Sequence, residues 1–155
     1  MLEAVPRHWY SWHYDLMEGV TRLAEVRVSS WRDAGQLTVG QNTFRVYRKG
    51  LCKGAFLLES DGSILAQAEK PSVFRRSLDI QHQGRHYILK TAGLFGRRVV
   101  LLDGPMEVGS LTRTILGRRA KVNLPEELSP PLKGFVVWLA VVLWKRGGAA
   151  TMATP

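Results

Sequence analysis

The sequence predicts a mainly β protein: a closed antiparallel barrel of about ten strands that encloses a hydrophobic C-terminal α-helix. Two observations predict this fold. Between about residues 23 and 123, apolar and polar residues alternate in short runs separated by turn signals, a pattern typical of strands with one face in a core. From residue 134 to 144 there are eleven residues without a polar or charged side chain, which have to be buried somewhere.

The alternating runs place the strands. Val26 and Val28, for example, alternate with Glu25 and Arg27, so the two valines belong to one face of a strand. Short strands at regular spacing indicate a sandwich or a barrel. The runs predict strands over residues 23–31, 36–40, 43–48, 54–59, 63–69, 73–80, 85–90, 97–102, 105–112 and 118–123.

Asp-Gly pairs mark two of the hairpin turns, Asp61-Gly62 and Asp103-Gly104. Both central residues of such a turn need a positive φ, which Asp and Gly tolerate. A third turn is predicted at Gly84, which makes the three glycines 22 and 20 residues apart. This spacing is the rhythm of consecutive hairpins, and we interpret it as a structural rhythm rather than a sequence repeat.

The apolar segment is predicted to be a helix over residues 131–146. Pro130 and Pro131 suit a first helical turn, and cations at Lys145 and Arg146 suit a last one. A membrane span needs about 20 apolar residues, so this shorter segment is expected to be buried in the protein's own fold. The alternative is a buried strand, because Val and Trp favour sheets; the length and the cationic end favour a helix. A helix without a polar face needs cover on all sides, which a closed sheet provides.

Three parts of the chain follow from this reading. Residues 1–22 are predicted to be an aromatic-rich segment packed on the barrel, with a short helical turn near 15–22; residues 23–146 form the barrel and its helix; residues 147–155 are a flexible tail. The N-terminus has no long apolar run, so a secretory signal peptide is not expected and the predicted location is cytoplasmic. With Cys52 alone, neither an intrachain disulfide nor a cysteine-based metal site can form.

Two stretches, FRVYRKGLCKGAFLLESDGSILAQAEK (44–70) and VVLLDGPMEVGSLTR (99–113), resemble the repeats of the tubby C-terminal-like superfamily, which includes tubby, the phospholipid scramblases and the LURP-one-related proteins. The resemblance covers roughly residues 35–146. It implies a barrel of about twelve strands round a hydrophobic helix, so the combined prediction is 10–12 strands. Scramblases carry a cysteine cluster and an acidic calcium segment, which this chain lacks. Tubby binds phosphoinositide through a cationic pocket, to which no residue here can be aligned.

Positive charge is concentrated in one third of the chain. The net charge is +9, and residues 70–121 contain eleven Lys or Arg against three acids. Such a surface favours phosphate-rich partners or anionic lipid; the alternative is a soluble surface that happens to be basic. Arginine pairs occur at 75–76, 97–98 and 118–119. Since neighbours in a strand point to opposite faces, each pair is expected at a strand end. Arg75, Arg76, Arg97, Arg98, Arg118 and Arg119 are therefore the predicted anion-binding residues, the alternative being three unrelated solvated edges.

No other pattern predicts chemistry. His82 and His86 flank a turn and could face each other, but a metal site needs a third ligand such as Asp79, so neither a metal nor a cofactor is expected. No catalytic motif is present and enzyme activity is not expected. Leu94 and Phe95 either dip into a membrane interface or pack on the barrel. Few aromatics accompany the basic residues, which argues against nucleic-acid binding.

The predicted function is therefore a non-enzymatic binding or scaffold domain. It is expected to bind anionic phospholipid or phosphoinositide at the inner membrane surface, without a transmembrane span, through the six arginines. The alternative is a protein-interaction module that uses the N-terminal aromatic residues, Trp9, Tyr10, Trp12 and Tyr14. The same aromatics could instead cap one mouth of the barrel.

Overall fold

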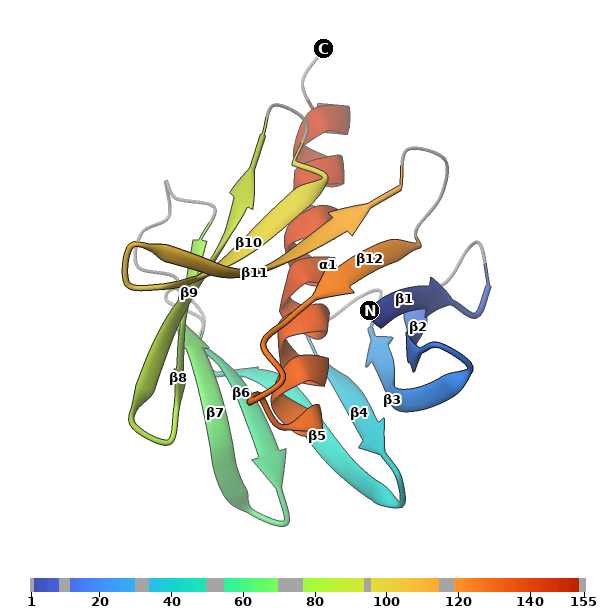
Figure 1. The fold of residues 1–155 in the computed structure, drawn as a ribbon, viewed down its shortest axis with the longest axis vertical. Coiled ribbons are helices and arrows are strands. Elements are labelled where there is room, and N and C mark those ends of the chain that lie inside the picture. Colours follow the sequence, from blue (N-terminus) through green and yellow to red (C-terminus); the bar gives the residue numbers. More distant parts are fainter. Residues whose placement is uncertain are drawn as a thin grey trace.

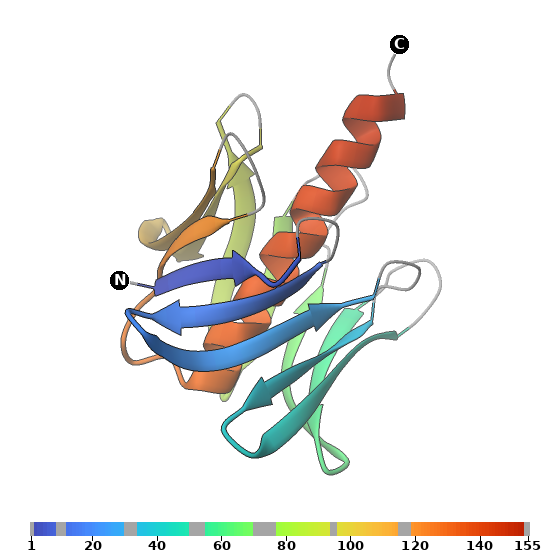
Figure 2. The ribbon, with the colours of Figure 1, turned by 90° about the vertical axis from the view of Figure 1, so that its right-hand side faces the viewer.

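The computed structural model describes residues 2–8, 12–29, 34–49, 55–69, 77–93, 96–114 and 119–153, with side chains as far as Lys145. Twelve strands and one helix make up these residues (Figures 1 and 2). They are β1 (Leu2–Pro6), β2 (His13–Glu18), β3 (Thr21–Val28), β4 (Gly35–Val39), β5 (Asn42–Lys49), β6 (Ala55–Ser60), β7 (Ser63–Glu69), β8 (Ser77–His82), β9 (Arg85–Ala92), β10 (Arg98–Asp103), β11 (Met106–Arg113), β12 (Ala120–Asn123) and α1 (Pro130–Ala153).

The strands form a closed antiparallel barrel. Each strand pairs with its neighbours in chain order, and β1 pairs with β12 to complete the ring. The predicted fold class is thus confirmed, and each of the ten predicted strands overlaps one of β3–β12. At the turn predicted from Asp61-Gly62, both residues have positive φ, 49° and 83°.

The prediction for residues 1–22 was wrong. Instead of a segment packed on the barrel with a helical turn near 15–22, this part of the chain supplies β1 and β2 of the barrel wall. The side chains of Leu2, Ala4, Tyr14 and Leu16 are buried, at a spacing of two residues. That spacing is the period of a strand, and it overrides the weaker helical stripe. Without β1, the edges of β2 and β12 would both be open.

The helix begins one residue earlier than predicted and ends seven residues later, at Ala153. The predicted flexible tail over residues 147–155 is therefore wrong as far as residue 153. A glycine in a helix costs only about 1 kcal/mol relative to alanine, and a helix that is already nucleated extends easily. Gly147 and Gly148 therefore do not end it.

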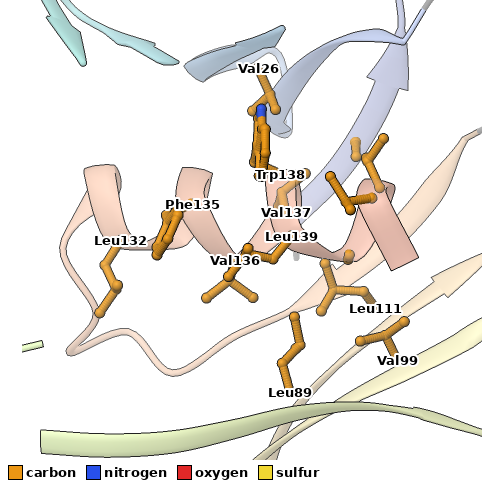
Figure 3. Close-up of a cluster of buried hydrophobic side chains, with 14 of the residues drawn as sticks. Val26, Leu89, Val99, Leu111, Leu132, Phe135, Val136, Val137, Trp138 and Leu139 are labelled. Atoms are coloured by element: carbon orange, nitrogen blue, oxygen red, sulfur yellow. The ribbon is translucent and has the colours of Figure 1, made fainter. Parts of the chain in front are cut away.

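The helix supplies the middle of the core. Each side chain from Phe135 to Trp144 is at most 8% exposed, so all faces of this part of α1 are covered. The helix lies closest to β3, β4 and β9. Figure 3 shows its side chains meeting those of the strands, among them Val26, Leu89 and Leu111.

One contact fixes the depth of the helix in the barrel. Trp138 is fully buried, its ring meets that of Phe56 edge to face at 5.4 Å between centroids, and its Nε1 donates a hydrogen bond of 3.2 Å to the carbonyl of Arg27. Gly35 makes this approach possible. A Cβ at that position would lie 2.0 Å from the Arg27 oxygen and 2.3 Å from the Trp138 nitrogen.

The wall has an approximate threefold pattern. The ladders β2–β3, β6–β7 and β10–β11 each contain a register shift directly after a leucine that pairs with a small residue. These pairs are Leu16 with Ala24, Leu58 with Ala66, and Leu101 with Gly109. The three hairpins begin at residues 13, 55 and 98, which is 42 and 43 residues apart. The first two hairpins each open a set of four consecutive strands, β2–β5 and β6–β9. The third set contains β10, β11 and β12, and β1 occupies its fourth place.

Candidate functional site

The up-and-down order of the strands sorts the connections between two ends of the barrel. The two-residue turns after β2, β4, β6, β8 and β10 lie at the end where α1 begins (Figure 1). The C-terminal ends of β1, β3, β5, β7, β9 and β11 lie at the opposite end, toward which α1 runs. We call these the turn end and the loop end.

Charge is divided sharply between the two ends. Each end comprises the two outermost residues of every strand and the described residues of the connections. The turn end has two basic residues (Arg22, Arg85) and eight acids (Glu3, Glu18, Glu59, Asp61, Asp103, Glu107, Glu126, Glu127). The loop end has one acid (Glu69) and nine basic residues (Arg7, Arg27, Arg48, Lys49, Arg97, Arg98, Arg113, Arg119, Lys121). The dipole of α1 favours negative charge near its N-terminus, at the turn end, and positive charge toward its C-terminus, at the loop end. The distribution of charged residues therefore matches the helix dipole.

Three of the six predicted arginines lie at the loop end. Arg98 is the first residue of β10, Arg97 precedes it, and Arg119 directly precedes β12. The arginine pairs were expected at strand ends, and these three arginines lie at strand ends. Arg75, Arg76 and Arg118 lie outside the described residues.

Arg113, a residue that the sequence analysis did not single out, joins the three. It is the last residue of β11, between β10 and β12. Its backbone N–H donates to the carbonyl of Arg97 at 2.9 Å, and the N–H of Thr114 donates to the carbonyl of Arg119 at 2.9 Å. Arginines 97, 113 and 119 therefore stand on three adjacent strand ends. Because Arg113 has no arginine beside it in the sequence, only the register of β10–β12 could reveal it.

The four side chains divide between the two faces of the sheet. Arg113 follows Leu111 by two residues and pairs with Ala120, both fully buried, so it belongs to the inner face; Arg97, opposite Arg113, belongs to the same face. Arg98 and Arg119 belong to the outer face.

The outer arginines have acidic partners, whereas the inner pair has none among the residues that the structure describes. Arg98 bonds Glu107, and Arg119 lies 3.8 Å from Glu3. For Arg97 and Arg113 no ion pair occurs within the described part of the chain, and the Nε of Arg113 is buried without a hydrogen-bond partner there. Two like charges directly opposite each other on one face repel unless an anion lies between them.

Other cations near the loop end are already neutralised. On the outer face of β2 and β3, Asp15 and Glu25 pair directly across the ladder. Arg7 contacts both carboxylates, at 3.1 and 3.2 Å, and His13 Nε2 lies 2.6 Å from Glu25. The hydrogen bond that Arg7 donates to Asp15 raises the pKa of the Arg7 guanidinium, in spite of an opposing desolvation effect. This cluster stabilises the wall and leaves little charge for a ligand.

The N-terminal aromatics that the structure describes are largely used by the fold. Tyr14 is fully buried on the inner face of β2, so it cannot contribute to a partner surface. Trp12 is partly buried and has the ammonium of Lys145 5.7 Å from its ring centre. Lys145 also donates to the carbonyl of Ser29 at 3.1 Å. Trp9 and Tyr10 lie outside the described residues.

His82 and His86, which could have faced each other across their turn, do not do so. The register pairs His82 with Arg85, and Gln81 with His86, so the two histidines belong to opposite faces of the β8–β9 hairpin. Asp79 Oδ2 lies 3.9 Å from His86 Nε2. Within residues 2–8, 12–29, 34–49, 55–69, 77–93, 96–114 and 119–145, no three His, Cys, Asp or Glu side chains are grouped closely enough to hold a metal ion.

Two further results bear on function. Among the described residues, no helix combines the length and the apolar character that a membrane crossing requires. No family model, no curated protein and no solved structure matches the chain.

Proposed function

We propose that the protein is a non-enzymatic binding domain of the tubby C-terminal-like kind, and that its loop end binds anionic phospholipid or phosphoinositide head groups. The observation that carries this proposal is the placement of Arg97, Arg113 and Arg119 on adjacent strand ends, linked through their backbones. The resemblance of residues 35–146 to that superfamily is a second, independent support.

The chemistry of the inner pair suits phosphate. The guanidinium group presents its donors in a planar fork that matches two oxygens of a phosphate. Arg97 and Arg113 lie opposite each other without an acidic partner among the described residues, and one donor of Arg113 is buried without an acceptor. A phosphate between the two guanidinium groups would supply the missing acceptors and remove the repulsion.

The division of charge favours one orientation at a membrane. The cytoplasmic leaflet is negative, and each nearby Lys or Arg contributes about 1 kcal/mol of attraction. An anionic surface would attract the loop end and repel the acidic turn end, so the protein would approach with its loop end toward the lipid. This orientation fits a cytoplasmic protein that is peripheral at the inner membrane surface.

Vesicle flotation with two variants of equal net charge tests the proposal. Arg97→Gln/Arg113→Gln removes the inner pair, whereas Arg22→Gln/Arg85→Gln removes the two arginines of the turn end. The first variant is expected to lose roughly 30-fold in binding to vesicles with phosphatidylserine or phosphoinositide at low salt, from about 1 kcal/mol per cation. The second is expected to bind like the unaltered protein.

Two outcomes would contradict the proposal. Equal enrichment of the unaltered protein on neutral and anionic vesicles would exclude anionic lipid as the ligand. Equal loss in both variants would show that net charge alone, without a site, accounts for the binding.

A further inference from the structure

The barrel wall opens between β7 and β8. These strands pair at only three positions, from Glu69 with Asp79 to Gln67 with Gln81. Beyond Gln67, β7 stays with β6, while β8 stays with β9 as far as the turn. The two hairpins separate toward the turn end, as Figure 1 shows at the lower left of the barrel. We call this opening the β7–β8 seam.

A histidine bridges the seam where the backbone ladder stops. His82 Nδ1 lies 2.7 Å from the carbonyl oxygen of Leu65. Because a carbonyl only accepts, Nδ1 carries the proton and donates it. Nε2 of His82 is thereby left for another partner.

The seam contains a pocket of about 450 Å³. Pockets of a few hundred Å³ are the size that small molecules occupy in proteins. The wall on the β7 side comes from Ile64, Leu65, Ala66 and Gln67, and it is apolar except for Gln67. On the other side, the β8–β9 hairpin supplies a polar wall with Gln81, His82, Gln83, Arg85 and His86.

The charge of this lining is opposite to that of its surroundings. None of the residues that line the pocket is an acid, although acids outnumber bases eight to two at the turn end. Two acids contact residues of the lining from outside it: Glu69 Oε1 accepts a hydrogen bond of 2.7 Å from Gln67 Nε2, and Asp79 Oδ2 lies 3.9 Å from His86 Nε2. Arg85 is exposed, and its guanidinium lies 5.9 Å from the ring centre of Tyr87. It makes no ion pair within the described part of the chain.

We propose that the β7–β8 seam binds a small organic acid, that is, a compact molecule with one carboxylate or phosphate group. Arg85 binds the oxyanion, and the carboxamides of Gln81 and Gln83 and Nε2 of His82 bind its remaining polar atoms. The apolar body of the molecule lies against Ile64 and Leu65. This site is at the other end of the barrel from the loop-end arginines and does not depend on them.

An NMR titration of ¹⁵N-labelled protein tests the site. The probes are acetate, benzoate and inorganic phosphate, each added at constant ionic strength against chloride. Saturable shift changes are expected for backbone amides of residues 64–67 and 81–86 with at least one probe. Benzoate is expected to bind more tightly than acetate, because its ring adds apolar contact. Comparing phosphate with the two carboxylates shows which type of oxyanion the site binds.

Arg85→Gln and Arg22→Gln are the matched variants, since both remove one exposed arginine of the turn end. Arg85→Gln is expected to weaken binding roughly tenfold or more, as the loss of a charge-assisted hydrogen bond requires, and Arg22→Gln to leave it unchanged. The proposal is overturned if the shifts do not saturate, equal those caused by chloride, or persist in Arg85→Gln. Vesicle flotation of Arg85→Gln should be unaffected, which separates a failure here from a failure at the loop end.

Discussion

Replacing Trp138 by phenylalanine isolates the hydrogen bond that connects the central helix to the wall. The phenyl ring keeps most of the apolar contact with Phe56 but cannot donate to the carbonyl of Arg27. The carbonyl then lies in a partly buried environment with one acceptor position unused. An orphaned buried group of this kind costs about 1–3 kcal/mol, and the smaller ring leaves a cavity that costs about 1 kcal/mol more. Trp138→Phe is thus expected to lower the free energy of unfolding by roughly 2–4 kcal/mol.

Trp144 provides the control, because it is a second buried tryptophan of the same helix whose indole N–H makes no hydrogen bond within the described part of the chain. Trp144 is 4% exposed and Trp138 is 0% exposed, and both belong to the same helix. The Nε1 of Trp144, however, has no hydrogen-bond partner among the described residues. Trp144→Phe removes an unsatisfied donor, and this gain offsets the lost contact area. Its expected cost is within about 1 kcal/mol of zero.

Urea unfolding at 25 °C, followed by far-UV circular dichroism, measures both variants without relying on the altered fluorophores. The midpoint should fall for Trp138→Phe and stay nearly constant for Trp144→Phe, with equal slopes. A loss in Trp144→Phe as large as that in Trp138→Phe would refute the reasoning, since ring volume and not hydrogen bonding would then decide the cost.

Two further predictions concern single contacts. Gly35→Ala should destabilise the protein by about 3 kcal/mol or more in the same unfolding assay, because its Cβ would lie 2.0 Å from the backbone oxygen of Arg27. Adding Trp138→Phe to Gly35→Ala should relieve only the part of this cost that is due to the indole, and full rescue would argue against a backbone clash. The hydrogen bond to Glu59 raises the pKa of Tyr47, so its phenol should ionise above the ordinary tyrosine range in a titration at 295 nm, with Tyr47→Phe as the subtraction. A tyrosine pKa that is raised by folding stabilises the folded protein at pH values below the pKa of the unfolded chain, and this contribution is lost as the pH rises through the pKa of the folded protein. Glu59→Gln should lower the pKa of Tyr47, and an unchanged pKa would contradict the role given to Glu59.

Local patterns in the sequence were sufficient for ten of the twelve strands, β3–β12, and for the burial of the helix. The alternation at Val26 and Val28, or the turn at Asp61-Gly62, depends only on near neighbours. The β1 strand could not be predicted in this way. Its five residues contain a proline and alternate weakly, and they become a strand because β12 and β2 offer their edges.

The candidate site shows the same limit. The arginine pairs predicted positions at strand ends, which Arg97, Arg98 and Arg119 occupy. That they meet at one end depends on the number of strands between them, because each added strand reverses the direction of the chain. A missing or additional strand in the prediction would have moved a pair to the other end. Arg113, an isolated arginine, carries no signal of its own until the register of β11 is known.

The number of strands follows from the size of the helix. Neighbouring strands are about 4.8 Å apart and tilt by about 40° in a barrel, so twelve strands give a circumference of about 75 Å and a radius of about 12 Å. A helix with its side chains has a radius of about 5–6 Å, which leaves about 6 Å for the inward side chains of the wall. Eight strands would give a radius of about 8 Å, enough for side chains alone. In the third set of hairpins, the chain forms α1 where a fourth strand would follow β12. The helix that requires the wide ring thus uses up the residues after β12, and β1, from the other terminus, has to complete the ring.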